Sequence, residues 1–377
     1  MQWLELFFDL IMVAAVLLLS SAYEWWSSSS DTLWIVAVFI AIWFGWLNAT
    51  LYVNRFPTDA PWYRYFVLVQ MFLIAVVAMA ASDGIRAHSG ITSITYGVLT
   101  ASYGLPLWFH RHGEHARYAR VRSRQYLVAA ALFIVAGFLP IPAQVVCWVV
   151  AAAVLAVPLM WPGHPRMSVS TEHIVERMGA LTLIMCGEAF GKVAIKVDNG
   201  RLEDIALGMT AALFALIFMI WWCYFADVPN VGLRGPATSA RRTAWMGSHL
   251  VLHLMIVGLA IGAAHFITLG HGDVPAKYIA QVAIPLAAFF VMLGVISALS
   301  GREPTAPLAA VRIGAAVLTF VIGYACWKLT WFDNAWALFA FVVLAGGTAR
   351  LSRVAMESAI PPAAMVATNR APGSDKD

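Results

Sequence analysis

Twelve long apolar runs follow one another along this chain, and only short polar junctions separate them. A transmembrane helix needs roughly 20 consecutive, mostly apolar residues, so each run is a candidate span. The runs lack the apolar–polar alternation of barrel strands, which favours helices. We therefore predict an all-α fold, a polytopic transmembrane helical bundle with about twelve spans. The spans are expected near residues 5–22, 32–53, 63–82, 91–109, 125–140, 142–160, 174–192, 203–226, 245–269, 277–299, 307–328 and 333–350.

Composition excludes the soluble alternatives. Hydrophobic residues make up 61% of the 377 residues and charged residues only 12%, whereas average soluble domains carry about 25% charged residues. A soluble fold of this length would lack the charged shell that keeps it dispersed. A soluble enzyme, a nucleic-acid binder and a disordered scaffold are therefore excluded. The four cysteines lie inside apolar runs without paired spacing, so we expect buried thiols and no disulfides.

Arginine and lysine are distributed unevenly between the two sides of the predicted bundle. If the N-terminus is cytoplasmic, the cytoplasmic junctions and the C-terminus hold 17 of these residues and the other side holds 6. Arg312 is counted on the cytoplasmic side and Lys192 on the outer side. Because positive residues are retained inside, both termini are predicted to be cytoplasmic.

Two copies of a six-helix unit are predicted within the chain. Residues 1–162 form the first membrane repeat, residues 163–354 the second, and residues 355–377 a disordered cytoplasmic tail. Trp62–Ser82 aligns on Trp245–His265 without gaps, although chance likeness among apolar helices is an alternative. An even number of helices per copy gives both copies one orientation, the parallel arrangement of some transporters. The fifth and sixth runs are either a tight helical hairpin or one broken re-entrant element.

Polar residues inside the apolar runs are the candidate proton-binding and substrate-binding residues. A charged side chain at mid-bilayer costs at least about 2.5–3.5 kcal/mol, so it must face protein or water. Most of the candidates lie in the predicted cytoplasmic half, but Glu188 lies about 18 Å beyond Glu176 along its helix. A structural carboxylate there would need a buried partner, and no basic residue is an obvious one, which favours a functional role. The candidates are Glu5, Asp9, Asn48, Tyr52, Asn54, Arg55, Glu176, Arg177, Glu188, Tyr224, Asp227, His249 and His253.

Glu5 and Asp9 lie one helical turn apart and therefore share a face. They are either a coupled carboxylate pair that carries a proton, or ion-pair partners of Arg55 or Arg177 that lock helices together. Glu176 and Arg177 open the seventh run, where we expect a structural ion pair.

His249 and His253 have the i, i+4 spacing that lets two imidazoles bind one metal. The stretch lacks the intervening glutamate of zinc proteases, although Glu176 or Asp9 could supply a third ligand. A proton relay or hydrogen-bonded packing are the alternatives. We expect no cofactor and no metal, and protons as the coupling ion. Catalytic residues are not identified.

The predicted partners follow from the membrane class. The loop Arg111–Arg124 is rich in arginine and histidine, so we expect it to face anionic lipid headgroups. The other expected partners are the lipid bilayer and a small molecule of unknown identity. Self-association into a homo-oligomer stays open, and no nucleic acid is expected.

Three stretches carry a family resemblance: Glu5–Leu10 with the sequence ELFFDL, Trp46–Asp59, and His173–Glu188, which contains HIVER and CGE. Together they resemble the bacterial low-temperature-requirement protein A (LtrA) family, from residue 4 to roughly residue 350. Met178 and the pair Met185-Cys186 depart from the usual residues. The resemblance implies a multi-spanning protein of the bacterial cytoplasmic (inner) membrane. It implies no established reaction.

Three functions remain open. The first is a proton-coupled secondary transporter of a small organic solute, because no nucleotide-binding motif is present. The second is a membrane-embedded enzyme that acts on a hydrophobic or lipid-like substrate through an acid/base or metal site. The third is a passive cation pathway. In the transporter, the proton carriers would be Asp9, Glu176, Glu188 and His253, and the substrate-orienting residues Asn48, Tyr52 and Tyr224.

Overall fold

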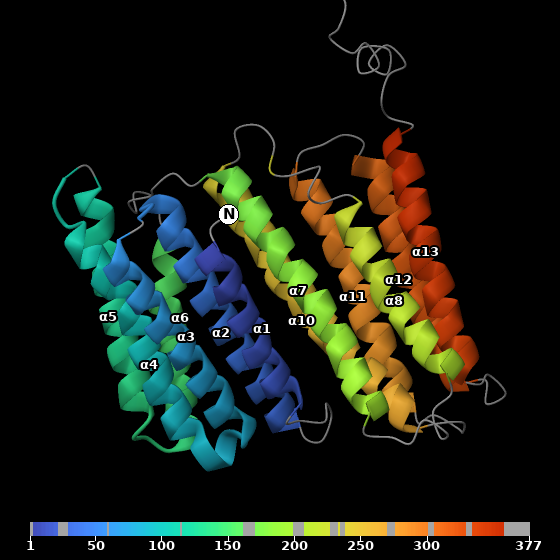
Figure 1. The fold of residues 1–377 in the computed structure, drawn as a ribbon, viewed down its shortest axis with the longest axis horizontal. Helices are drawn as coiled ribbons and strands as arrows, with labels where there is room; N and C mark the ends of the chain where they lie inside the picture. The colour runs from blue at the N-terminus through green and yellow to red at the C-terminus, as the bar shows by residue number, and fades with distance from the viewer. Residues whose placement is uncertain are drawn as a thin grey trace, which may run out of the picture. The chain divides into compact units, whose positions relative to one another are not determined.

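The computed structural model describes twelve helices and, within the described residues, no strand. The described residues are 3–21, 29–58, 60–113, 115–160, 170–198, 207–226, 233, 238–269, 276–300, 305–328 and 334–357. The helices are α1 (Trp3–Ser21), α2 (Ser29–Arg55), α3 (Pro61–Ser82), α4 (Ile85–Phe109), α5 (Ala116–Ala136), α6 (Ile141–Met160), α7 (Thr171–Asp198), α8 (Leu207–Phe225), α10 (Ser239–Leu269), α11 (Ala276–Ser300), α12 (Thr305–Lys328) and α13 (Asn334–Glu357). They follow the twelve predicted runs in order, which confirms the predicted fold class (Figure 1).

Seven of the described helices are long and apolar enough to cross a membrane. They contain the segments Trp3–Ser21, Ser30–Arg55, Pro61–Ser82, Ala240–His265, Tyr278–Ser300, Pro307–Lys328 and Leu338–Ala355. Two shorter apolar helices are Ile141–Ala156 and Thr210–Phe225. The chain is thus a multi-span helical membrane protein whose apolar helices suit contact with lipid.

One expectation about a loop was wrong. Helix α5 begins at Ala116, so Arg117 to Arg124 are helical and only the residues before them can form the predicted loop. Alanine, arginine and glutamine are good helix formers, so the helix continues where the apolar run stops. Hydropathy indicates which residues can lie in the membrane, whereas backbone propensity and hydrogen bonding determine where the helix begins and ends.

The chain divides into two compact units. Unit 1 comprises Met1–Ile195 and Ile256–Ala264, and unit 2 comprises Lys196–Met255 and His265–Asp377. The six-helix repeat and its proposed boundaries remain predictions.

Within unit 1, helices α4 and α5 pack with close backbones. Gly90, Gly97 and Gly104 recur every seven residues along α4. A Cβ atom on Gly97 would lie 2.6 Å from Ile134 Cγ1 and 2.9 Å from the Ala130 carbonyl oxygen. Glycine therefore permits this approach, as small residues do in membrane helix pairs.

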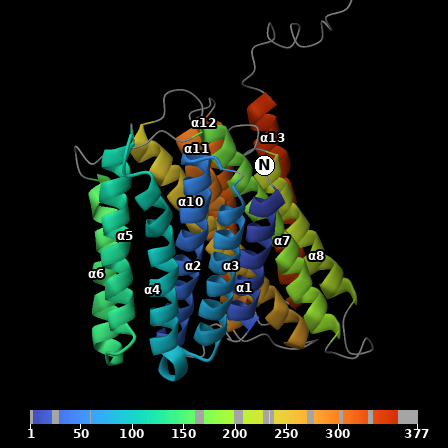
Figure 2. The same cartoon turned by 60° about the vertical axis from the view of Figure 1, so that its left-hand side comes forward.

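The fifth and sixth runs, predicted as either a helical hairpin or one broken re-entrant element, correspond to helices α5 and α6. They are two separate helices that lie side by side in both views (Figures 1 and 2). They therefore form the helical hairpin.

Candidate functional site in unit 1

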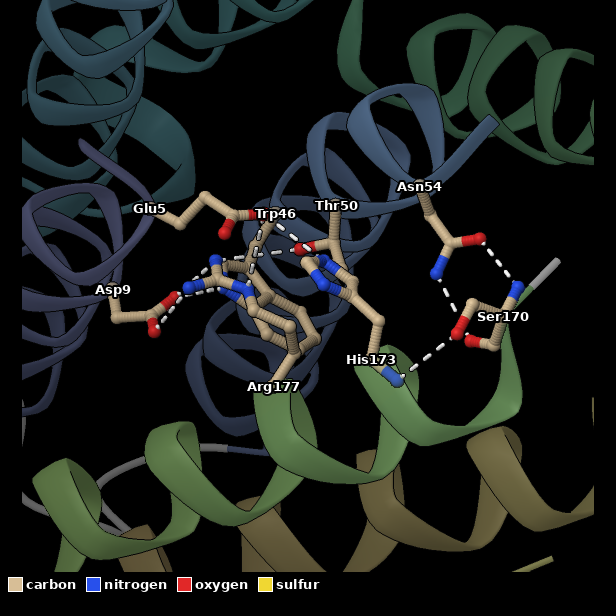
Figure 3. Close-up of polar contacts among 8 residues, drawn as sticks. All are labelled: Glu5, Asp9, Trp46, Thr50, Asn54, Ser170, His173 and Arg177. Atoms are coloured by element: carbon tan, nitrogen blue, oxygen red, sulfur yellow. Dashed lines mark hydrogen bonds and ion pairs between the residues drawn. The ribbon is translucent and has the colours of Figure 1, made fainter. Parts of the chain in front are cut away.

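A buried ion pair joins α1 to α7. Arg177 donates two hydrogen bonds to the Asp9 carboxylate, from Nη1 to Oδ2 at 2.7 Å and from Nη2 to Oδ1 at 2.6 Å. Asp9 is 0% exposed and Arg177 is 2% exposed. Figure 3 shows the carboxylate and the guanidinium meeting in this two-point contact. Charge-assisted pairs of this geometry are among the strongest hydrogen bonds in proteins.

Helix α2 completes the surroundings of this pair. Trp46 Nε1 donates to Asp9 Oδ1 at 2.5 Å, so the carboxylate accepts a third hydrogen bond. Arg177 Cζ lies 5.7 Å from the centroid of the Trp46 ring. Thr50, one turn further along α2, places its hydroxyl 3.5 Å from Arg177 Nη2. A charge buried without such partners would be strongly destabilising, so three helices cooperate to keep both charges here.

Glu5 and His173 extend the cluster by one helical turn. His173 Nε2 lies 3.0 Å from Glu5 Oε1, and Arg177 Nε lies 4.0 Å from the same oxygen. Glu5 and Asp9 share the buried face of α1, and His173 and Arg177 are four residues apart on α7. We call these four residues the acid–base cluster. With a neutral imidazole its two carboxylates and one guanidinium sum to one negative charge.

Asn54 fixes the start of α7. Its Nδ2 donates to the Ser170 carbonyl at 3.0 Å, and its Oδ1 accepts from the Ser170 backbone N–H at 2.7 Å. The backbone N–H of His173 lies 3.4 Å from Ser170 Oγ, the position of a helix N-cap acceptor. The end of α2 therefore sets the first turn of α7, on which His173 stands (Figure 3).

A cavity of about 320 Å³, part of it open to solvent, lies beside the acid–base cluster. Its polar lining comes from Glu5, Thr50, Tyr63 and Arg177, and apolar side chains form the rest. A small molecule or water in this cavity can therefore reach the carboxylate of Glu5. Asp9 is not part of the lining.

The two arginines proposed as partners of the carboxylates have different neighbours. Arg177 is the ion-pair partner of Asp9, whereas Arg55 Cζ lies 5.2 Å from the ring centroid of Tyr118. Glu176 is exposed, so its side chain points away from the buried face that holds Arg177.

Asn48 and Tyr52 contact other partners in unit 1. The Tyr126 hydroxyl donates to Asn48 Oδ1 at 2.6 Å, and the Tyr52 hydroxyl lies 3.3 Å from His110 Nε2. Burial lowers the pKa of His110, which lies just past the end of α4, and the nearby His115 lowers it further. These hydrogen-bond partners of Asn48 and Tyr52 are not members of the acid–base cluster.

Glu188 has a basic neighbour that the sequence did not make obvious. Lys192 lies one turn later on α7, is 8% exposed, and lines the same cavity as Glu188. Its Nζ donates to the Ser20 carbonyl at 2.8 Å and to Ser20 Oγ at 2.9 Å. Lys192 is thus a buried residue rather than part of an outer junction.

The histidines of unit 2 form a separate buried group. The Tyr224 hydroxyl lies 3.2 Å from His249 Nε2, and His249 Nδ1 lies 2.9 Å from the Trp245 carbonyl. The His249 and His253 rings are 6.0 Å apart, and both are 0% exposed. Asp227 lies outside the described residues. Within the part of the chain that the structure describes, no three histidine, cysteine, aspartate or glutamate side chains form a group that could hold a metal.

Arg312 in unit 2 is likewise a buried helix residue. It lies within α12, is 0% exposed, and its Nη1 donates to the Leu293 carbonyl at 2.7 Å and to Ser297 Oγ. Its inclusion among the cytoplasmic junctions was therefore wrong. Leaving out Arg312 and Lys192 does not change the direction of the charge asymmetry.

His173, Ser170 and Thr50 were not among the predicted site residues. A signal was present for His173, which stands four residues before Arg177 and so shares its face. The sequence gives no comparable spacing signal for Thr50 and Ser170, because their roles depend on which helices are neighbours.

Comparison with known proteins adds the family. The model of the bacterial low temperature requirement A protein (LtrA) family matches residues 1–349. An uncharacterized protein of Rhizobium meliloti (strain 1021) is 25% identical over 268 residues, which are 67% of this chain and 65% of the relative. The match thus spans slightly less than two thirds of the relative's length. Because the family model covers nearly the whole helical region, this chain belongs to the bacterial low temperature requirement A family.

Proposed function

We propose that this chain is a proton-coupled secondary transporter of a small organic solute, and that the acid–base cluster is its proton site. One observation carries the proposal. Two carboxylates, one guanidinium and one imidazole are gathered between membrane helices beside a cavity that reaches Glu5. Such groups are expensive in a membrane and are typical of proton relays and substrate pathways.

The contacts suggest different roles for the two carboxylates. Asp9 accepts two hydrogen bonds from Arg177 and one from Trp46, which stabilise its ionised form. Glu5 instead lines the cavity and faces an imidazole, a group whose ordinary protonation range includes neutral pH. One added proton on the Glu5–His173 pair makes the cluster neutral. A neutral cluster is less costly to move or to desolvate, which would couple protonation to a conformational step.

Reconstituted vesicles test the proposal. Purified protein is placed in vesicles loaded with a pH-sensitive dye, and a panel of small amino acids, organic acids and amines is added outside. We expect at least one solute to drive proton movement, and Glu5→Gln and His173→Gln to abolish it. Glu172→Gln removes an exposed carboxylate from the same helix and should leave the proton movement unchanged. Unchanged movement in folded Glu5→Gln and His173→Gln protein would overturn the assignment.

The same vesicles distinguish the other two functions. A membrane-embedded enzyme would alter a lipid or isoprenoid chemically without solute-driven proton movement. A passive cation pathway would carry current under an ion gradient without any added solute. Either result replaces the transporter.

We also infer a lipid contact on α5. Arg117, Arg120 and Arg124 are exposed and share one helix face, which suits attraction to anionic headgroups. Location in the bacterial inner membrane, with both termini in the cytoplasm, is part of the same proposal.

A further inference from the structure

Unit 1 contains a second polar cavity, which also lies along α1 and α7. It has a volume of about 280 Å³, part of it open to solvent. Its polar side chains are Ser20, Glu188 and Lys192. The remaining lining is apolar and comes from α1, α7 and the Ile256–Ala264 segment of α10. A mostly apolar wall with a few convergent polar groups is the usual composition of a small-molecule site.

Lys192 is buried and hydrogen-bonded in this cavity. Its ammonium donates to the backbone carbonyl and to the hydroxyl of Ser20, and its side chain is 8% exposed. Ser20 lies in the last turn of α1, where carbonyls have no partner within the helix. A cation there also complements the negative end of the helix dipole. The positive charge therefore has a defined position.

Glu188 supplies the opposite charge in the same cavity. It precedes Lys192 by four residues on α7, so the two side chains share a face and their backbones are about 6 Å apart. The charges compensate each other on the protein. They also match the two charges of a molecule that carries one ammonium and one carboxylate.

We propose that this cavity binds a small zwitterion with an apolar side group, such as a short aliphatic amino acid. The ligand's carboxylate would approach Lys192 and the Ser20 hydroxyl, and its ammonium would approach Glu188. A solute with a single charge would compensate only one of the two ionic side chains, which is costly among apolar walls. The proposal rests on the proposed function and names its substrate class.

The position of this cavity gives a physical route for coupling. Arg177 and Lys192 are 15 residues apart on the same helix, or about 22 Å. Both contact α1, at Asp9 and at Ser20. A tilt or shift of α7 against α1 would therefore change the proton site and the zwitterion site together.

Three probes test the site: L-alanine, propionate, which is alanine without its ammonium, and ethylamine, which is alanine without its carboxylate. The last two each keep one of alanine's charges. Binding is measured by titration calorimetry on the full chain in lipid nanodiscs. We expect alanine to bind at least about tenfold more tightly than either fragment, and Glu188→Gln to weaken alanine binding by at least about tenfold. Lys192→Met should do the same, and Glu172→Gln should bind alanine as the unchanged protein does.

The outcomes separate the two proposals. Equal binding of alanine and its fragments, or full binding by Glu188→Gln, overturns the zwitterion site. If Lys192→Met does not fold, the three probes and Glu188→Gln still decide. Alanine binding without proton movement in vesicles would keep the site and reject coupled transport. Proton movement driven only by solutes other than zwitterions would keep the transporter and reject the site.

Discussion

At the scale of single residues, the Asp9–Arg177 pair is the feature on which unit 1 most depends. Both side chains are almost completely buried, and each neutralises the other. Removing one partner leaves a buried charge without its counterion, whereas removing both leaves none. The stability of unit 1 should therefore respond differently to the removal of one partner and to the removal of both.

We predict that Arg177→Met lowers the free energy of unfolding by about 3–5 kcal/mol. The double variant Asp9→Leu/Arg177→Met should recover much of this loss, because no buried charge remains. Both are measured by thermal unfolding in detergent. Arg64→Gln removes an exposed arginine and should stay within about 0.5 kcal/mol of the unchanged protein. Losses that simply add in the double variant would contradict a direct interaction.

At the scale of helices, the α4–α5 contact depends on glycine. A Cβ atom on Gly97 would overlap Ile134 and a backbone carbonyl, whereas nothing lies within 4 Å of a Cβ atom on Gly187 in α7. We predict that Gly97→Ala destabilises the protein by about 1–3 kcal/mol through overpacking. Gly187→Ala, the same chemical change, should be neutral or slightly stabilising. A thermal unfolding series compares them, and equal melting temperatures would show that α4 and α5 are less close.

The arginine face of α5 gives a second prediction at this scale. Replacing Arg117, Arg120 and Arg124 by glutamine should reduce stabilisation by anionic lipid by about 1 kcal/mol per charge. The melting temperature is compared in phosphatidylglycerol and phosphatidylcholine nanodiscs. Arg64→Gln serves as the single-charge control away from this face. A triple variant that still distinguishes the two lipids would place the headgroup contact elsewhere.

At the scale of the whole molecule, the charge asymmetry predicts the orientation. Alkaline phosphatase is active only outside the cytoplasm, so a fusion after residue 357 should be inactive. A fusion between the first and second helices should be active. The opposite pattern would invert the topology, and two active fusions would mean an odd number of spans.

The sequence by itself determined the membrane class and the order of the twelve helices that the structure describes. Apolar runs and the placement of arginine and lysine are local properties, and a helix satisfies its backbone hydrogen bonds locally. The sequence also identified Glu5, Asp9 and Arg177 as residues that need a partner, because they are charged and lie within apolar runs. It left Arg55 and Arg177 as equal alternatives.

Only the tertiary structure decided which of these groups meet. Asp9 and Arg177 are 168 residues apart, and Ser20 and Lys192 are 172 apart. Their contacts depend on which helices are neighbours and on how each helix is rotated about its axis. Hydropathy constrains that rotation weakly, because a membrane helix can face lipid and protein with similar apolar side chains. The packing of side chains between neighbouring helices therefore determined the ion-pair and hydrogen-bond partners that the sequence pattern left open.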